Sequence, residues 1–221
     1  MRYIDLTVEL AHGMVRHPAP HLPPVEVVPV AQHEKERRSV QRVTFGTHVS
    51  THFDAPFHAI PEGQTIDQVP IDTCVGPAEL IRVKGCGLDN PIDEADLSPF
   101  EDRLSVCERI VIETGWAEKT WGTREYFTEG PYLTRTAAHY ISKFAIKLIG
   151  TDFPNIDSAE ETKPGIPAPN HNIILGKGVV LLENLVRLNE IPGDRFQLIS
   201  LPLRLIGGDG CPGRAVAQID D

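Results

Sequence analysis

Short apolar runs separated by turn residues recur along this chain, a pattern typical of a protein that mixes helices with strands. The segment 133–144 has a largely helical pattern, and Thr134 is a suitable N-cap for it. Alternating or continuous apolar runs predict strands over residues 25–30, 40–45, 78–83, 109–113, 145–149 and 196–203. Gly150 is expected to end the fifth of these strands. The pattern therefore indicates the α/β class.

A glycine-rich turn interrupts the apolar stretch that follows residue 170. Residues 171–175 and 179–184 lie on either side of this turn at 176–178, which predicts a hairpin of neighbouring strands. Such a hairpin would bring its two ends, His171 and Glu183, close together. The alternative is that His171 lies in an exposed loop.

Length and composition limit the class of protein. The 221 residues suffice for one compact domain over residues 1–221, and the 41% of hydrophobic residues are ample for its core. No stretch is long and apolar enough to span a membrane, and the first residues lack the form of a signal peptide. The four cysteines show no paired spacing, which is typical of reduced thiols in a cytoplasmic protein. The net charge of −10 argues against binding to nucleic acid.

The richest chemistry follows the second predicted strand, in the segment His48-Val49-Ser50-Thr51-His52-Phe53-Asp54-Ala55-Pro56-Phe57-His58. Imidazole and carboxylate groups suit zinc, manganese or iron(II). On a regular strand His48 and His52 would lie about 13 Å apart, too far for two ligands of one ion. On a helical turn His48 and His52 would lie on the same face, but Asp54 would point away from it. Pro56 also disfavours a helical conformation at Ala55. We therefore expect a strand that ends near Thr44, then a tight turn that curls His48, His52 and Asp54 around one ion.

This segment predicts a hydrolase. A divalent cation would lower the pKa of bound water toward roughly 7 and would polarise a carbonyl group. The leaving atom of the substrate then needs a proton, which an imidazole with a pKa near about 6.5 can deliver. His58 lies four residues past Asp54, close to the ion without having to bind it. The alternatives are that His58 is a fourth ligand or orients another ligand, and that the segment is a solvated loop.

The same segment resembles the signature HxGTHxDxPxH of the metal-dependent cyclase-like hydrolases, which include bacterial kynurenine formamidases and isatin hydrolases. This chain reads HVSTHFDAPFH, so every ligand position matches, and Ser50 stands where the family usually has Gly. Other stretches similar to the family are Asp5-Leu6-Thr7, Thr114-Gly115-Trp116, Gly150-Thr151-Asp152, 171–175, Glu183-Asn184-Leu185 and Gly210-Cys211-Pro212-Gly213-Arg214-Ala215. The resemblance implies a single α/β domain of the swivelling β/β/α type, with a small barrel-like mixed sheet.

The resemblance also implies a set of metal ligands. His48, His52 and Asp54 match the ligands of a first ion, and Asp54 would bridge to a second. His171 matches a ligand of the second ion, and Glu183 matches one that both ions share. Zinc is the expected metal and manganese the alternative. The anionic Glu183 favours room for two ions rather than one.

Further roles follow from the resemblance. His58 matches the general acid/base of the family. Kynurenine formamidases carry an aromatic residue before a proline in the early loop, where this chain has His17 before Pro18. The polar His17 argues against N-formylkynurenine, and Arg16 could meet a substrate carboxylate, so a small acidic amide or lactone is expected. An irregular surface loop is the alternative for this segment. Family members often build active sites across subunit contacts, which implies a homodimer or homotetramer.

The expected function is hydrolysis of an amide bond in an arylformamide or a cyclic amide, as kynurenine formamidases perform in tryptophan catabolism. Hydrolysis of a lactone or ester is an alternative within the family. A metal-binding protein without activity is an alternative outside it, and the presence of His58 favours the enzyme. A serine-nucleophile hydrolase lacks support because the chain has no GxSxG motif.

Overall fold

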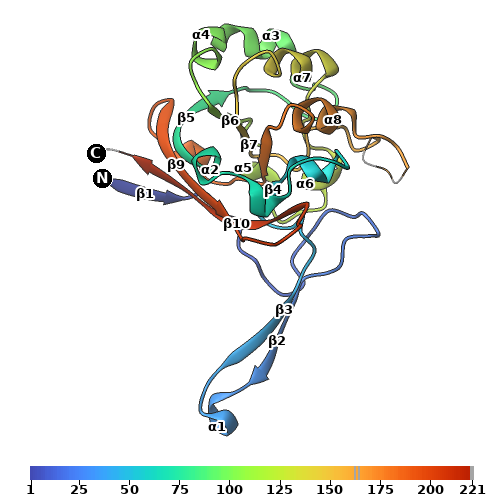
Figure 1. The fold of residues 1–221 in the computed structure, drawn as a ribbon, viewed down its shortest axis with the longest axis vertical. Coiled ribbons are helices and arrows are strands. Elements are labelled where there is room, and N and C mark those ends of the chain that lie inside the picture. Colours follow the sequence, from blue (N-terminus) through green and yellow to red (C-terminus); the bar gives the residue numbers. More distant parts are fainter. Residues whose placement is uncertain (162, 164, 220–221) are drawn as a thin grey trace.

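A mixed sheet that closes on itself forms the centre of the computed structural model, which describes residues 1–161, 163 and 165–219 (Figure 1). Its strands are β1 (Arg2–Asp5), β4 (His52–Asp54), β5 (Val75–Arg82), β6 (Arg109–Glu113), β7 (Leu148–Thr151), β8 (Val180–Glu183), β9 (Arg195–Pro202) and β10 (Gly210–Ile219). Their order is β1-β10-β4-β8-β7-β6-β5-β9, and a further pairing of β10 with β9 closes the ring. β1 pairs with β10 at the side of this ring. The expected α/β fold with a barrel-like mixed sheet is confirmed.

The pairs β5–β6, β6–β7 and β7–β8 are parallel. The other strand pairs of the ring are antiparallel. Neighbouring residues of these strands belong to two different cores, since side chains alternate between the faces of a sheet. Leu80 and Val111 join Phe53 in a cluster inside the ring. Ile81 and Ile112 pack in a second cluster on the outer face, beneath the helices. Burial on both faces explains the nearly continuous apolar runs of these strands.

Short helices cover the outer face of the parallel strands or connect the strands. They are α2 (Ile71–Cys74), α3 (Glu94–Leu97), α4 (Glu101–Leu104), α5 (Trp116–Thr120), α6 (Glu125–Thr128), α7 (Arg135–Ile141) and α8 (Pro169–Leu175), with the 3₁₀ turns η1 (Pro56–His58), η2 (Ile66–Gln68), η3 (Ser98–Phe100) and η4 (Leu188–Glu190). The predicted N-cap of α7 is confirmed, because the Thr134 hydroxyl accepts a hydrogen bond from the backbone N–H of Ala137 at 3.1 Å. In the described ranges, no helix has the length and apolar character needed to cross a membrane.

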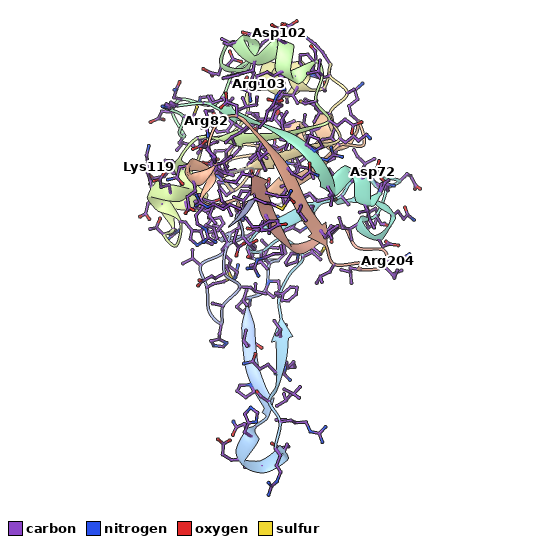
Figure 2. The ribbon with its side chains drawn as sticks, turned by 90° about the vertical axis from the view of Figure 1, so that its left-hand side faces the viewer. Asp72, Arg82, Asp102, Arg103, Lys119 and Arg204 are labelled. Atoms are coloured by element: carbon purple, nitrogen blue, oxygen red, sulfur yellow. The ribbon has the colours of Figure 1, made fainter. Side chains whose placement is uncertain are left out.

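A two-stranded arm projects from the body of the molecule (Figures 1 and 2). It consists of β2 (Glu26–Ala31) and β3 (Val40–Thr44), which pair antiparallel, and its tip carries α1 (His33–Glu36). Every residue of β3 is exposed. Both strands were expected from the sequence, but their separation from the main sheet was not.

Three local predictions were wrong. The segment before the glycine-rich turn at 176–178 is the helix α8, so no hairpin forms there. Gly150 lies inside β7 and does not end it. The turn after β3 covers residues 47–51, but His52 and Asp54 do not belong to it, because they lie on the short strand β4.

Candidate metal centre

β4 lies between β8 and β10 and presents two predicted ligands on one face. His52 and Asp54 are two residues apart and point to the same side, whereas Phe53 points into the core of the barrel. Glu183 on β8 pairs directly with His52, so its carboxylate reaches the same face. His52 Nε2 lies 3.3 Å from Asp54 Oδ1 and 3.6 Å from Glu183 Oε2.

His48 reaches this face from the bend before β4. The bend requires a left-handed backbone at Ser50, whose φ is 58°, a conformation that glycine adopts most easily. The Ser50 hydroxyl donates a hydrogen bond to a buried backbone carbonyl, that of Val8, at 2.7 Å, which helps to hold the bend. His48 Nδ1 then lies 2.7 Å from Asp54 Oδ1. The imidazole passes over Gly210 of β10, where a Cβ atom would come within 3.0 Å of His48 Cε1.

His171 approaches from the first turn of α8. Its Nε2 atom lies 3.5 Å from Asp54 Oδ2 and 3.9 Å from Glu183 Oε1. Its Nδ1 atom lies 2.6 Å from Asp157 Oδ2. The Asp157 carboxylate also accepts hydrogen bonds from the backbone N–H groups of Asn170 and His171, at 2.7 and 3.1 Å. Asp157 therefore fixes both the start of α8 and the orientation of the imidazole.

All five predicted ligands thus converge on one point, although the chain separates them by up to 135 positions between His48 and Glu183. The donor atoms of His48, His52 and Asp54 lie within 4.8 Å of one another, and so do those of Asp54, His58 and His171. Glu183 Oε1 is buried and has no hydrogen-bond partner in the described structure. A buried carboxylate oxygen without a partner, beside imidazole nitrogens, is the arrangement that a divalent cation would complete.

The charges of this cluster are balanced by protons in the absence of a cation. Burial opposes the charged form of His48, but Asp54 and Asp209 outweigh it and raise its pKa to about 10. Burial likewise opposes the charged form of His171, and Asp157 and Asp54 raise its pKa to about 10. Burial and the neighbouring Asp54 carboxylate raise the pKa of Glu183. The site therefore favours positive charge, which protons or a cation can supply.

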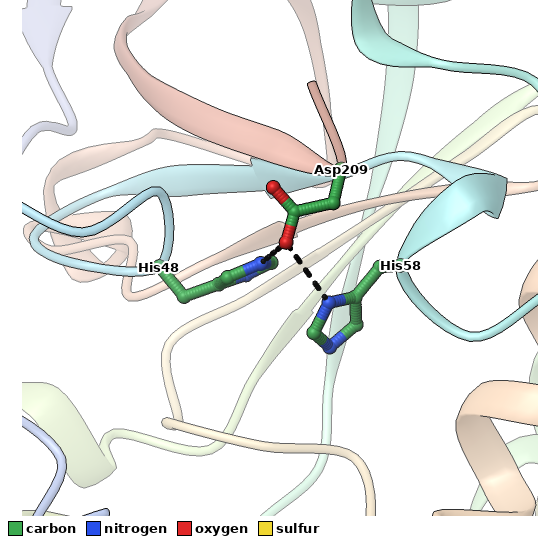
Figure 3. A group of neighbouring side chains, drawn as sticks. All are labelled: His48, His58 and Asp209. Atoms are coloured by element: carbon green, nitrogen blue, oxygen red, sulfur yellow. Dashed lines mark hydrogen bonds and ion pairs between the residues drawn. The ribbon is translucent and has the colours of Figure 1, made fainter. Parts of the chain in front are cut away.

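His58 stands at the end of η1, next to His48 and Asp209 (Figure 3). Its ring centroid lies 4.0 Å from that of His48 and 5.6 Å from that of His171. Burial is the main cause that lowers the pKa of His58, and the Asp209 carboxylate partly opposes this. His58 is therefore next to the predicted ligands and is available as a neutral base at neutral pH.

Sequence reasoning missed three polar residues that hold the predicted ligands. Asp209 Oδ2 lies 2.8 Å from His48 Nε2, and Asp157 contacts His171 as described above. The Asn184 side chain donates to the backbone carbonyl of Ser50 at 2.7 Å and lies 3.3 Å from His52 Nδ1. Two of them had a signal in the sequence, since Asp209 precedes, and Asn184 lies within, a stretch that resembles the family. Asp157 had none.

The predicted substrate residues line the same cavity as the ligands. The ring of His17 meets Phe127 edge-on, with 6.0 Å between centroids. Burial lowers the pKa of His17 to about 4, so its imidazole is neutral at pH 7. The Arg16 guanidinium donates to the backbone carbonyls of His17 and Ala19, at 2.9 and 3.4 Å, and thereby braces the loop.

The cysteines take no part in this centre. All four thiols are free, as expected for reduced cysteines. Burial raises the pKa of Cys211 to about 11, which makes it a poor nucleophile at neutral pH.

The fold and the cluster define a class of protein: a barrel-like α/β protein with an imidazole and carboxylate centre suited to a divalent cation. Residues 4–158 match the family described as "Putative cyclase". The chain is 36% identical over 185 residues to the kynurenine formamidase of Geobacillus thermodenitrificans, covering 81% of this chain and 80% of that protein. It is 31% identical over 217 residues to the kynurenine formamidase of Bacillus cereus, covering 98% and 97%. The protein belongs to the cyclase family.

Solved structures share the same fold. An isatin hydrolase bound to the product analogue thioisatinate superposes with a TM-score of 0.85 at 21% identity, covering 99% of this chain and 92% of that one. A potential metal-dependent hydrolase with cyclase activity gives a TM-score of 0.74 at 23% identity, covering 98% and 96%.

Proposed function

We propose that this protein is a metal-dependent hydrolase that cleaves the carbon–nitrogen bond of an amide, either an arylformamide or a cyclic amide. The observation that carries this proposal is the convergence of three imidazoles and two carboxylates in one cavity, with Glu183 Oε1 lacking a hydrogen-bond partner. The names of the relatives, kynurenine formamidase and isatin hydrolase, support the same class of reaction.

A divalent cation fits the donor set, with zinc as the first choice and manganese as the second. His48, His52 and Asp54 would hold one ion, Asp54 and His171 would hold a second, and both ions would share Glu183. When bound, such an ion supplies Lewis acidity, which lowers the pKa of water and polarises a carbonyl group.

The protein's own residues provide the proton transfer. His58 Nδ1 faces Asp209, at 3.7 Å from its Oδ2 atom, so His58 Nε2 is the nitrogen available to a substrate. Because burial lowers its pKa, this imidazole is unprotonated at neutral pH and can accept a proton from water. It can then deliver that proton to the leaving nitrogen. His17 and Phe127 line this cavity next to each other.

The substrate side of the cavity supports a small acidic amide. His17 is neutral and therefore offers a polar but uncharged edge, whereas Arg16 brings a permanent positive charge to the same cavity. A substrate carboxylate would balance that charge. A lactone with a similar acidic group is the second candidate, because water activated by a cation attacks either carbonyl.

The projecting arm supports a homodimer or homotetramer. A two-stranded ribbon is at best marginally stable in water, so packing against another surface would stabilise it. Val30, Val40 and Val43 are exposed on this arm. A second copy of the chain is the partner that we propose, and the cytoplasm, where the thiols stay reduced, is the proposed location.

The first test is the metal content per chain of protein purified without added metal, together with assays of N-formylkynurenine and isatin hydrolysis. Bound zinc or manganese with turnover of either compound would support the proposal. Bound metal without turnover of these two would direct the search to other amides and lactones. No metal after reconstitution would refute the proposal.

His58→Ala separates an enzyme from a metal-binding protein. The variant should keep its metal and lose turnover by about 100-fold or more, because His58 moves the proton without binding the ion. Unchanged turnover would remove His58 from the mechanism.

A further inference from the structure

We propose that Asp209 is a positioning residue that fixes the tautomer of His58 and couples His58 to the metal centre through His48. The proposal rests on the hydrolase function above. A single oxygen, Asp209 Oδ2, lies 2.8 Å from His48 Nε2 and 3.7 Å from His58 Nδ1 (Figure 3). The two imidazoles that share this carboxylate have ring centroids only 4.0 Å apart.

The contact with His48 follows a pattern that the site contains twice. His48 directs Nδ1 toward Asp54, at 2.7 Å, and Nε2 toward Asp209. His171 directs Nε2 toward Asp54 and Nδ1 toward Asp157. In both cases one ring nitrogen faces the shared carboxylate of the centre, and a second carboxylate holds the other nitrogen from behind. A carboxylate in that position fixes which nitrogen carries the proton and leaves the inner nitrogen free for an ion.

The same argument applies to His58. A negative oxygen near Nδ1 favours the proton on that nitrogen, so Nε2 is left as the base. The separation of 3.7 Å is an ion-pair distance, and contacts of this kind often tighten only when a substrate binds. In the described structure Asp157 contacts α8 and Arg135, whereas Asp209 contacts both a predicted ligand, His48, and the predicted acid/base, His58.

The backbone holds Asp209 in register with His58. The carbonyl of Asp209 accepts a hydrogen bond from the N–H of Ala55 at 2.9 Å, and Ala55 directly precedes η1, the turn that ends with His58. The next residue, Gly210, pairs with Asp54. Asp209, the predicted ligand Asp54 and the turn that ends with His58 therefore lie on one hydrogen-bonded framework.

Asp209→Asn tests the proposal, because it keeps the shape of the side chain and removes its charge. The affinity for zinc should fall by about 10- to 100-fold. When excess zinc fills the site again, kcat should still be lower by about 100-fold, while KM changes little. His58 is still present in this variant, but its proton is no longer confined to Nδ1, so Nε2 is less often available as the base. In the metal-free protein, nitrogen NMR of the His58 ring should show proton on Nδ1 in the wild type and a mixture of tautomers in Asp209→Asn.

Two other variants separate this role from a merely structural one. Asp157→Asn should weaken zinc binding to a similar extent but leave the His58 tautomer unchanged. Asp67→Asn is the control. The Asp67 carboxylate lies outside the cavity and accepts a hydrogen bond from the N–H of Gly207, two positions before Asp209. This variant should change neither zinc affinity nor kcat. If Asp209→Asn does not fold, Asp209→Ser takes its place in the same measurements.

Three results would overturn the proposal: an unchanged His58 tautomer in Asp209→Asn, an unchanged kcat once zinc is restored, or the loss of one ion from the stoichiometry. The third would make Asp209 a ligand. The NMR and zinc measurements do not need a substrate. A wild-type protein that binds zinc but hydrolyses no amide would therefore refute the hydrolase function and leave the effect of Asp209 on His58 still measurable.

Discussion

The imidazoles of the centre do not present the same atom to it. His48 turns Nδ1 inward, whereas His52 and His171 turn Nε2 inward. This difference arises from the groups behind each ring: Asp209 for His48, Asp157 for His171, and the Ser50 carbonyl for His52, at 3.1 Å from its Nδ1 atom. Removing one of these imidazoles therefore also takes a hydrogen-bond partner away from the group behind it.

His52→Ala should lose metal and activity together. His52 Nε2 lies 3.3 Å from Asp54 Oδ1 and 3.6 Å from Glu183 Oε2, so the substitution takes away an imidazole ligand next to both carboxylates. Elemental analysis of the purified variant, beside a wild-type sample treated identically, gives the metal content. Full occupancy in His52→Ala would refute its role as a ligand.

Glu183→Gln should reduce the number of bound ions. The amide keeps the size of the side chain but withdraws the negative charge that two neighbouring cations would share. Metal titration followed by isothermal calorimetry gives the stoichiometry. An unchanged value of two ions per chain would argue against a shared ligand.

Metal binding should release protons, because His48 and His171 have pKa values of about 10 in the metal-free centre. At about pH 8 both rings are protonated and must lose those protons to bind an ion, so the apparent affinity should rise with pH up to about 10. The same protons stabilise the metal-free fold below the ordinary histidine pKa, and that stability should be lost as the pH rises toward 10.

The enthalpy of zinc binding, measured at one pH in buffers of different ionisation enthalpy, reports the number of protons released. Binding enthalpies that do not depend on the buffer would show that the rings are already neutral.

At this scale the sequence was informative about the residues that act directly and less so about those that support them. A dense local motif identified His48, His52, Asp54 and His58, since a cluster of imidazoles has few structural explanations. The structure brings these residues and the distal pair together, and their roles remain predictions. Asp157 escaped notice because a single carboxylate far from the motif in the sequence carries no local signal.

At the scale of elements, the segment that ends at Leu175 shows where pattern reasoning failed. A short apolar run does not distinguish a strand from a buried helix. Here Pro169 opens α8 at its first turn, where a missing N–H costs nothing, and the Asp157 carboxylate binds the N–H groups of the next two residues. β4 was mistaken for part of a turn because three residues are too few to show alternation.

Gly210→Ala should destabilise the protein, because β4 and β10 approach too closely at this position for any side chain. A Cβ atom at Gly210 would lie 2.2 Å from the backbone oxygen of Phe53, which cannot move without disturbing the strand that carries His52 and Asp54. The expected loss is about 1–3 kcal/mol in the free energy of unfolding, measured by urea denaturation.

Gly87→Ala is the matched control, since a Cβ atom there would meet nothing within 4 Å. Equal stability of the two variants would show that β10 can shift away from β4.

At the scale of the whole molecule, charge is unevenly distributed. The chain has a net charge of −10, yet residues 26–44 of the arm carry four basic and three acidic side chains. A slightly basic arm on an acidic protein is complementary to the body of a second copy. The seven-stranded ring itself could not be derived from periodicity, because closure depends on pairings between strands far apart in the sequence, such as β4 with β10.

Val30→Asp combined with Val43→Asp should dissociate the oligomer, because both side chains are exposed on the arm and charge opposes their burial at an interface. Light scattering after size-exclusion chromatography gives the mass of wild type and variant. Val106→Asp, at a still more exposed apolar residue outside the arm, is the control that should leave the mass unchanged. A wild-type protein that is monomeric would contradict the proposed partner.

The position of β10 in the chain has a consequence for how the protein is made. β10 follows every other described strand and pairs with β1, β4 and β9, so the ring stays open until this strand has left the ribosome. Asp209 arrives at the same late moment. During most of translation His48, His52 and Asp54 would therefore be accessible to solvent on an unclosed sheet, and metal captured then would be held by an incomplete centre. The emergence of β10 from the ribosome, rather than the supply of metal, would set when the mature centre forms.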